Sequence, residues 1–458
     1  MSFSTEIFIF IFFPIVLMVY MLCKNIKVKN AVLLVASLIF YSWGGIKNCI
    51  LMLFLIFVNY ILGIWVKGRK KILILAVICN IGILTVFKYT GFICEILNQI
   101  FAEGFEAGIT VPNIVQPIGI SFFTFSILSY IIDVYYGKIS AQKNVISLGL
   151  YVLMFPKIMS GPIVRYADIE DEIQNRKFNV EQCHAGLRRF FLGFAKKVIL
   201  ANQMAGAADA AFNYEWGLHP VYAWVGAISY TVYIYLDFSA YSDMAIGIAH
   251  IFGFHFKENF NYPYISTSIK EFWRRWHISL SSWFRDYVYI PLGGNRKGNG
   301  RTYINQMIVF FLTGLWHGAS WNFIVWGLYY GCFLLIEKMT GFCAKIPKWL
   351  SYIYTMLVVI WGWVFFRADN LRSAVKYIGY MFGIQKGGIR NMDMIRVLNP
   401  QYFVFLVFSI ILSTPLVKKA AGRIKQEWIK DVGVLVVFFI ALCYMAASDY
   451  NPFIYFRF

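Results

Sequence analysis

Long apolar runs bounded by short polar segments recur along almost the whole chain. A helix needs roughly 17 to 25 apolar residues to cross about 30 Å of hydrocarbon, so the pattern predicts about eleven to thirteen transmembrane or re-entrant helices. We place them at 5–23, 31–46, 49–66, 72–89, 115–136, 145–160, 219–238, 241–256, 303–319, 321–336, 349–366, 402–416 and 429–447.

Interruptions in these runs divide one membrane-embedded domain, residues 1–458, into three parts. Residues 1–113 carry few polar groups at membrane depth and are predicted to be scaffold helices, whereas residues 339–458 are plain C-terminal spans. In residues 114–338, polar, Gly and Pro residues break the runs, as in FPKIMSGPIVRY. Backbone that leaves the helix inside a membrane must pack on protein or line a wet cavity. We therefore expect the functional core in residues 114–338.

Composition agrees with a polytopic membrane protein, because 59% of the 458 residues are hydrophobic and only 14% are charged. The net charge of +19 comes from 42 Lys and Arg against 23 Asp and Glu. The basic residues gather in short loops such as 24–29 and 67–71, which alternate with the loop that holds Glu95, Glu103 and Glu106. Basic loops stay in the cytoplasm, so we expect the N-terminus outside and no nucleic-acid partner. The first run lacks a basic n-region and a cleavage site, which favours a retained helix over a signal peptide.

The segment GLRRFFLGFAKKVIL, residues 186–200, overlaps the end of the strongly basic stretch between Arg165 and Lys197. Helical spacing places its apolar residues close to one face and the basic residues largely off it. This pattern predicts a helix that lies in the membrane interface. The apolar residues are Leu187, Phe190, Phe191, Phe194 and Val198.

Carboxylates within the apolar runs are few, and two of them flank the predicted break in YLDFSAYSDM. Asp237 and Asp243 lie on either side of Ser239, Tyr241 and Ser242, whose hydroxyls could bond the freed backbone. One interpretation is a structural network at the break. The other is that these groups orient a substrate or a histidine.

Six histidines are available, and four of them lie at loop or span-edge positions where a structural or interfacial role is the simpler interpretation. These four are His184, His219, His250 and His255. His277 and His317 remain as candidates for chemistry.

His277 lies in EFWRRWHISLSSWFRDYVYIPLGG, where Arg274, Arg275 and Arg285 mix with aromatic residues such as Trp276. One interpretation is an aromatic and basic belt that anchors helices at the cytoplasmic face. The alternative is a pocket for an anionic cytoplasmic molecule, with arginines for phosphate and aromatic faces for a ring. A nucleotide-bearing acyl donor such as coenzyme A fits the second interpretation.

His317 lies in GLWHGASW, residues 314–321, at the end of an apolar run. The preceding loop GGNRKGNGR is basic and therefore cytoplasmic, so a helix from Tyr303 carries His317 roughly 20 Å inward at about 1.5 Å per residue. A titratable group at that depth predicts a functional site, although a histidine bonded to a nearby carbonyl is the alternative. Gly314 and Gly318 leave room beside it, and Trp316 supplies a rigid wall. A neutral imidazole there could act as a general base.

Other chemistries lack support in the sequence. There is no G-x-S-x-G elbow, Walker loop or G-x-G-x-x-G, so hydrolase, ATPase and dinucleotide-binding functions are not predicted. The eight cysteines form no C-x-x-C and have no histidine at ligand spacing, so neither a metal site nor a disulfide framework is expected.

Two segments, RRWHISLSSWFRDYVYIPLGGNRKG and GLWHGASWNFIVWG, resemble the membrane-bound O-acyltransferases, in particular the bacterial branch that contains the membrane subunit of alginate O-acetylation. PIGISFFTFSILSYIIDVYYG, FPKIMSGPIVR, YLDFSAYSDMAIG, ENFNYPY and the C-terminal NPFIYFRF are also similar to that branch. The likeness extends over nearly the whole chain and is densest from about 114 to 338.

This resemblance implies an all-α polytopic fold, a ring of helices around a thin central region with an extracellular funnel. It also implies a multi-pass enzyme of the bacterial cytoplasmic membrane that passes an acetyl group from a cytoplasmic donor, acetyl-CoA, to a partner or polysaccharide outside. The family's two histidines fall on His317 and His277, which we expect to be catalytic. The other expected donor or substrate contacts are Arg274, Arg275, Trp276, Arg285, Asp286, Trp316, Asn261, Asp237 and Tyr241.

No tightly bound cofactor is expected. Besides the lipid bilayer, the expected partner is an extracytoplasmic acetyltransferase of the SGNH or acyl-esterase type, or a polysaccharide synthesis complex. Alternatives stay open: D-alanyl transfer to teichoic acids from a carrier protein, a transporter or flippase, or an assembly scaffold. Alginate, cellulose, peptidoglycan and other polymers are all compatible acceptors.

Overall fold

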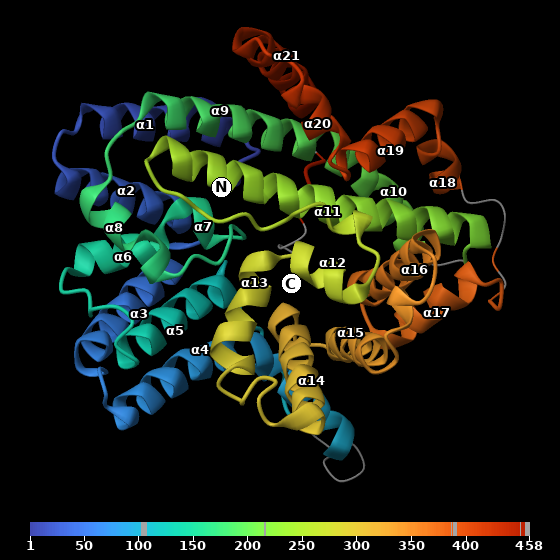
Figure 1. Ribbon diagram of the computed structural model, residues 1–458, viewed down its shortest axis with the longest axis horizontal. Helices are drawn as coiled ribbons and strands as arrows, with labels where there is room; N and C mark the ends of the chain where they lie inside the picture. The colour runs from blue at the N-terminus through green and yellow to red at the C-terminus, as the bar shows by residue number, and fades with distance from the viewer. Residues whose placement is uncertain (102–107, 215–216, 386, 388–391, 449, 454–458) are drawn as a thin grey trace. The chain divides into compact units, whose positions relative to one another are not determined.

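The computed structural model describes residues 1–101, 108–214, 217–385, 387, 392–448 and 450–453 (Figure 1). These residues form helices and loops without a strand. They divide into two compact units, Met1–Gly186 with Ile248–Lys257, and Leu187–Gly247 with Glu258–Phe458. The division passes through two helices, α9 (Val180–Ala195) and α11 (Pro220–Ile251). Glu103, Glu106 and the last five residues of NPFIYFRF lie outside the described residues.

The first unit is built mainly from apolar helices. Amide side chains join two of these helices, because Asn80 donates to Asn59 at 2.7 Å and Asn59 donates to Asn80 at 3.1 Å. The elements are η1 (Ile7–Phe12), α1 (Phe13–Leu22), α2 (Ile26–Ser42), α3 (Ile46–Trp65), α4 (Lys70–Phe101), α5 (Ile120–Tyr135), α6 (Val145–Leu153), α7 (Phe155–Ile158) and α8 (Tyr166–Asn175).

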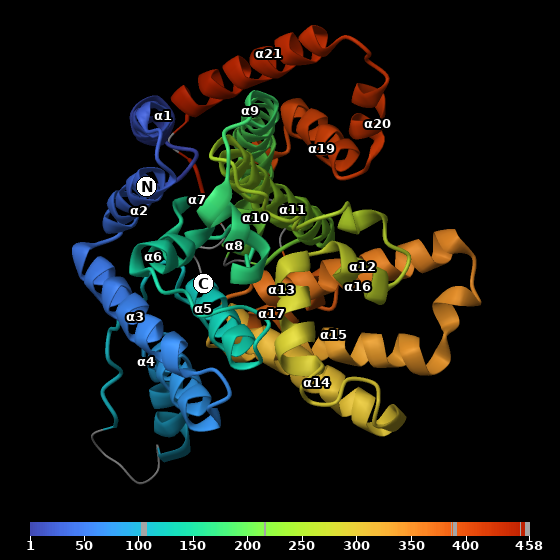
Figure 2. The same ribbon diagram turned by 60° about the vertical axis from the view of Figure 1, so that its left-hand side comes forward.

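The second unit contains both candidate histidines, and Figure 2 shows its helices from a second side. Its elements after α9 are η2 (Lys196–Ala201), α10 (Asn202–Phe212), α11, η3 (Pro263–Ile265), α12 (Ile269–Arg275), α13 (Ile278–Phe284), η4 (Arg285–Tyr289), α14 (Gly298–His317), α15 (Trp321–Thr340), η5 (Phe342–Ala344), α16 (Lys348–Arg367), α17 (Leu371–Met381), α18 (Met392–Val397), α19 (Pro400–Leu412), α20 (Leu416–Gly422) and α21 (Glu427–Ala446).

The prediction of an all-helical, polytopic membrane protein is confirmed. By length and apolar composition, five of the described helices could cross a membrane: α3, α4, α15, α16 and α21. The pair α19 and α20, bent by 71° at a short break, is a sixth candidate. Several other predicted segments form shorter helices, such as α5 and α6. The ring, the funnel and the division at residues 113 and 338 stay predictions.

The predicted break between residues 238 and 241 is wrong, because both positions lie within the continuous 32-residue helix α11. Asp237 and Asp243 do not end the helix, since their charges are paired from outside it. Asp237 Oδ1 lies 2.7 Å from Lys197 Nζ, and Asp243 lies 2.6 Å from Lys196 Nζ.

The apolar face of α9 packs on protein, which corrects the prediction of an interfacial helix. Phe190 and Phe194 are buried, and a side chain added at Gly193 would meet Ala240 O of α11 at 2.9 Å. Its basic residues are also engaged: Arg188 pairs with Glu427 and Asp431, and Arg189 with Asp243 and Glu258. Periodicity identifies the apolar face, but it cannot distinguish a protein neighbour from lipid.

The close crossing of α14 and α15 determines the position of His317. A Cβ atom at Gly314 would lie 2.3 Å from Phe323 O, and one at Gly327 would lie 2.3 Å from Phe310 O. Only glycine allows the two backbones to approach this closely. The small residues predicted to leave room beside His317 are therefore used at this crossing for the neighbouring helix.

Candidate active site

His317 is the last residue of α14, directly before the chain turns into α15. Only 5% of its surface is exposed. Three aromatic rings surround the imidazole: the ring centroids of Trp316, Trp326 and Phe366 lie 4.9, 5.0 and 5.1 Å from its own. These rings come from α14, α15 and α16, so the crossing of three helices encloses the histidine in apolar surroundings.

His277 lies at the junction between α12 and α13, outside the candidate membrane-crossing helices. Its backbone is left-handed, with φ of +42°, a conformation that non-glycine residues adopt rarely and that marks functional sites when the surroundings hold it. The backbone is held by its neighbour, since Ile278 N donates to Asn259 O at 2.9 Å. The side chain is 1% exposed, and this burial lowers the pKa of His277 to about 3. The ring is therefore neutral at physiological pH.

Asn259 determines which nitrogen of His277 carries the proton. Its Oδ1 accepts from Ser279 Oγ at 2.8 Å, while its Nδ2 donates to Ser242 Oγ at 3.3 Å. The oxygen of this amide therefore faces His277, whose Nδ1 lies 3.2 Å away. Because a carbonyl oxygen can only accept, Nδ1 is assigned as the donor and Nε2 carries the lone pair.

Trp316 connects the two histidines. The His277 ring centroid lies 5.9 Å from that of Trp316 and the His317 centroid 4.9 Å from it, both in edge-to-face geometry. The fold thus brings the two predicted catalytic residues, 40 positions apart in the sequence, onto one indole. Phe238 of α11 adds a further wall, with its ring 4.7 Å from His277.

The predicted donor-binding residues lie around the α12 to α13 segment. Arg274 is exposed at the end of α12, and Arg275 is held by Glu271 at 2.8 Å and by Asn261 O at 3.0 Å. Arg285 pairs with its neighbour Asp286 at 2.6 Å.

Trp276 belongs to the aromatic core beside this segment. It is buried, and its ring centroid lies 4.7 Å from that of Trp363 and 5.1 Å from that of Phe260. Its position supports the fold around His277.

Three further predicted site residues have their contacts elsewhere. Asp237 pairs with Lys197, and the ring of Tyr241 lies 4.9 Å from that of Phe453. Asn261 is exposed and uses its backbone to bind Arg275. Its near neighbour Asn259 is the amide that contacts His277, and sequence reasoning missed it. Both asparagines stand in ENFNYPY, so the sequence identified the correct segment but the wrong asparagine within it.

Comparison with known proteins places this geometry in a family. The model of the membrane-bound O-acyltransferase family matches residues 139–374, a range that contains both histidines and Asn259. Over its whole length the chain is 38% identical to the whole of the "Probable alginate O-acetylase" of Pseudomonas putida. It is 31% identical to the Peptidoglycan O-acetyltransferase of Helicobacter pylori, over 100% of this chain and 97% of that one.

A third relative is matched over a shorter range. The Teichoic acid D-alanyltransferase of Bacillus subtilis is 32% identical over 54% of this chain and 66% of its own. The chain belongs to the membrane-bound O-acyltransferase family and is an O-acyltransferase.

Proposed function

We propose that this O-acyltransferase passes an acetyl group from cytoplasmic acetyl-CoA to a hydroxyl on the other side of the bacterial cytoplasmic membrane, with its N-terminus outside. The observation that carries the proposal is the contact of two buried histidines with the single indole of Trp316. The relatives that match over the full length are named for O-acetyl transfer, whereas the D-alanyl relative matches about half of the chain. This difference favours the acetyl group over D-alanine.

His317 is the proposed general base. Its imidazole takes the proton of the acceptor hydroxyl while the hydroxyl oxygen attacks the thioester carbonyl carbon of the donor. The new C–O bond forms, the C–S bond breaks, and the proton passes from the imidazole to the departing thiolate. The products are the acetyl ester and free coenzyme A, so no oxidant or reductant is required. General acid–base catalysis of this kind typically contributes about 10²- to 10⁴-fold to the rate.

His277 is proposed to hold the donor from the cytoplasmic side. A neutral ring whose Nδ1 donates to Asn259 presents Nε2 as an acceptor for a donor group of the substrate. Arg274, Arg275 and Arg285 lie on the same short segment and are proposed to contact phosphate groups, to which guanidinium binds in a bidentate manner. Arg274 and Arg285 are exposed, as contact with a soluble donor requires.

The acceptor is proposed to be the serine of an extracytoplasmic acetyltransferase of the SGNH or acyl-esterase type, or a sugar hydroxyl of an exported polysaccharide. In both cases the nucleophile is an alcohol of ordinary pKa, so a base next to the reacting atom is needed in the transition state. His317 fits that role because it combines burial with a position at a helix end.

The test is acetyl transfer by the full-length protein in inside-out membrane vesicles supplied with radiolabelled acetyl-CoA. His317→Ala is expected to abolish label transfer to polymer and partner. His219→Ala is the matched control, because this histidine lies directly before α11 and away from the site, and it is expected to keep label transfer. Transfer at the wild-type rate by His317→Ala, at equal protein level, contradicts the assignment. Label transfer from a D-alanyl carrier protein but not from acetyl-CoA contradicts the proposed donor.

A further inference from the structure

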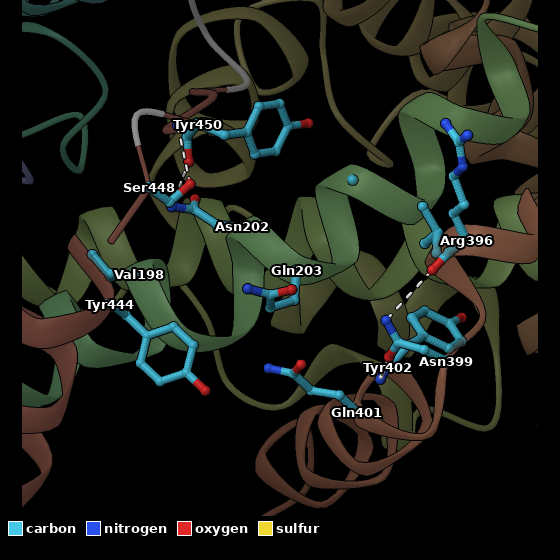
Figure 3. Close-up of a pocket in the computed structure, with 12 residues that line it drawn as sticks. Val198, Asn202, Gln203, Arg396, Asn399, Gln401, Tyr402, Tyr444, Ser448 and Tyr450 are labelled. Carbon is cyan, nitrogen blue, oxygen red and sulfur yellow. Dashed lines mark hydrogen bonds between the residues drawn. The ribbon is translucent and has the colours of Figure 1, made fainter. Parts of the chain in front are cut away.

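A polar pocket of about 300 Å³ lies in the second unit, separate from the two histidines (Figure 3). Its walls are η2 and α10 on one side, the α18 to α19 segment on another, and the end of α21 with the residues that follow it. Neither the mechanism above nor the family resemblance uses this pocket. Six residues describe its chemistry: Asn202, Gln203, Gln401, Tyr402, Tyr444 and Ser448.

Two glutamines, Gln203 and Gln401, supply two of the polar groups of this pocket. In Figure 3 the amide of Gln401 on α19 points toward Gln203 on α10 and the ring of Tyr444. Neither glutamine side chain forms a hydrogen bond with another residue in the part of the chain that the structure describes. By contrast, Asn399 caps α19 through Tyr402 N at 2.9 Å, and Tyr402 Oη bonds Ser229 at 2.8 Å. The two glutamines are thus available to a ligand, whereas those neighbours serve the fold.

The chemistry of these groups indicates a neutral ligand rich in hydroxyls. Each carboxamide offers both donors and an acceptor, which complements neighbouring hydroxyl groups that also donate and accept. Tyr444 adds a rigid face for apolar C–H groups together with a hydroxyl. Among the lining residues that the structure describes there is no carboxylate, and the guanidinium of Arg396, the one cationic residue among them, points away from the glutamines in Figure 3. The volume is at the lower end of the roughly 300 to 1,000 Å³ found for ligand pockets.

The charge pattern of the second unit indicates which membrane face this pocket adjoins. The basic segment VKKAAGRIKQEWIK ends within the first turn of α21, so the start of α21 is expected in the cytoplasm. Twenty helical residues span about 30 Å, enough to cross the bilayer. Tyr444 lies at the far end of α21 and Ser448 just after that helix, so the pocket is expected on the outer face, where an exported polysaccharide would be.

A short chain of contacts joins this pocket to the surroundings of His317. Tyr450, another lining residue, donates to Asp209 Oδ2 at 2.7 Å, and Asp209 Oδ1 lies 2.7 Å from Arg367. The preceding residue, Phe366, packs its ring 5.1 Å from that of His317. Through Tyr450 and Asp209 the pocket is therefore connected to the end of α16, which carries one of the rings beside the proposed base.

We propose that this pocket binds one neutral sugar ring of the exported glycan and so holds the acceptor polymer at the enzyme. The proposal rests on the proposed function for the identity of the acceptor. It extends that function, because it gives the membrane subunit its own contact with the polysaccharide.

The experiment measures binding of cellotetraose, a neutral tetrasaccharide, to the full-length protein in lipid nanodiscs free of sugar-headed detergents. Gln203→Leu and Gln401→Leu are each expected to weaken binding about 10-fold, as loss of a hydrogen-bonded pair worth about 1.4 kcal/mol predicts. Gln306→Leu on α14 removes a glutamine outside the pocket and is expected to bind as wild type does. Gln203→Asn retains the amide on a side chain shorter by one methylene. It serves as a second test if the leucine variant does not fold, and it too is expected to weaken binding.

Several outcomes would overturn the proposal. One is the absence of saturable cellotetraose binding, and another is equal cellotetraose binding by wild type and the Gln203 and Gln401 variants. A third is tighter binding of a mannuronate tetrasaccharide that is lost in Arg396→Ala. Displacement of cellotetraose by an anionic phospholipid, with loss of lipid binding in Arg396→Ala, would assign the pocket to a lipid instead. His317→Ala separates this proposal from the proposed function, because it should bind cellotetraose normally while losing acetyl transfer. Normal transfer by His317→Ala together with glutamine-dependent binding would contradict the catalytic assignment and leave the sugar site standing.

Discussion

Arg367 Nη2 lies 2.7 Å from Asp209 Oδ1, an ion pair that joins the last residue of α16 to α10. The Arg367 side chain is 3% exposed and that of Asp209 is 32% exposed. Arg367 also donates to Asn213 Oδ1 at 3.0 Å. The pair therefore fixes the helix end that carries Phe366, and with it one wall around His317.

Removing the carboxylate of this pair is expected to cost more than removing the cation. Asp209→Ala leaves a buried guanidinium without its counter-charge, which destabilises by about 3 kcal/mol, whereas Arg367→Met leaves a carboxylate that water can reach. The measurement is thermal unfolding of the detergent-solubilised protein. Lys257→Ala, which breaks the exposed pair with Asp168, is the control and should be within about 1 kcal/mol of wild type. Equal losses in Asp209→Ala and Lys257→Ala would refute this account.

A side chain added at Gly314 is expected to disrupt the folded protein. Its Cβ would lie 2.3 Å from Phe323 O, a backbone atom that cannot move aside cheaply. We expect Gly314→Ala to destabilise by several kcal/mol, about the range seen for overpacked cores or above it, and to lower the yield of folded protein. Gly300→Ala in the same helix meets no atom within 4 Å, so it should be neutral or stabilising. Size-exclusion chromatography and thermal unfolding of the two variants distinguish these outcomes.

The buried, neutral state of His277 is expected to make stability depend on pH. Burial lowers the pKa of His277 to about 3 in the folded protein, against about 6.5 in the unfolded chain. Between these values the unfolded chain binds the additional proton, so stability falls as the pH falls below 6.5, by up to about 1.4 kcal/mol per pH unit. His277→Gln should lack this component. Unfolding temperatures compared at pH 7.5, 6 and 5 test it, and an identical pH slope in the two proteins would exclude it.

Asn259→Asp is expected to move the pH dependence of activity. A carboxylate at this position would favour the charged imidazolium of His277 and raise the pKa of that residue. The acid limb of the pH–rate profile should therefore shift to higher pH, because protonated Nε2 can no longer accept a hydrogen bond. Asn261→Asp places the same charge at an exposed position two residues away and should leave the limb in place. A shift of the same size in both variants would mean that general charge, and not contact with His277, is responsible.

The positions of many helices follow from the spacing of apolar residues. The side chains that pair with one another across different helices do not. The spans at 303–319 and 321–336 correspond to α14 and α15, because a run of apolar residues with loop residues on both sides determines a helix largely by itself. The failure at α11 has a different origin. Whether Asp237 and Asp243 end a helix depends on Lys197 and Lys196, which lie some 40 residues earlier in the chain.

The candidate site was predicted in part for the same reason. His317 and His277 stand out locally, since a histidine in apolar sequence is unusual. Their common contact with Trp316 depends on the crossing of α14 with its neighbours, which no local pattern describes. Asn259 was missed in favour of Asn261 because both amides stand in ENFNYPY, and only the folded chain shows that Asn259 is buried beside His277 while Asn261 is exposed.

The aromatic surroundings of His317 also affect how much of the donor is lost to hydrolysis. An activated thioester beside a general base is open to attack by water as well as by the acceptor, and hydrolysis would waste the donor. Trp316, Trp326 and Phe366 pack their rings within about 5 Å of the imidazole centroid and offer water few hydrogen-bonding partners there. In the proposed mechanism these rings therefore limit hydrolysis of the donor. The fraction of donor that is converted to ester then depends on how tightly the helices pack around His317.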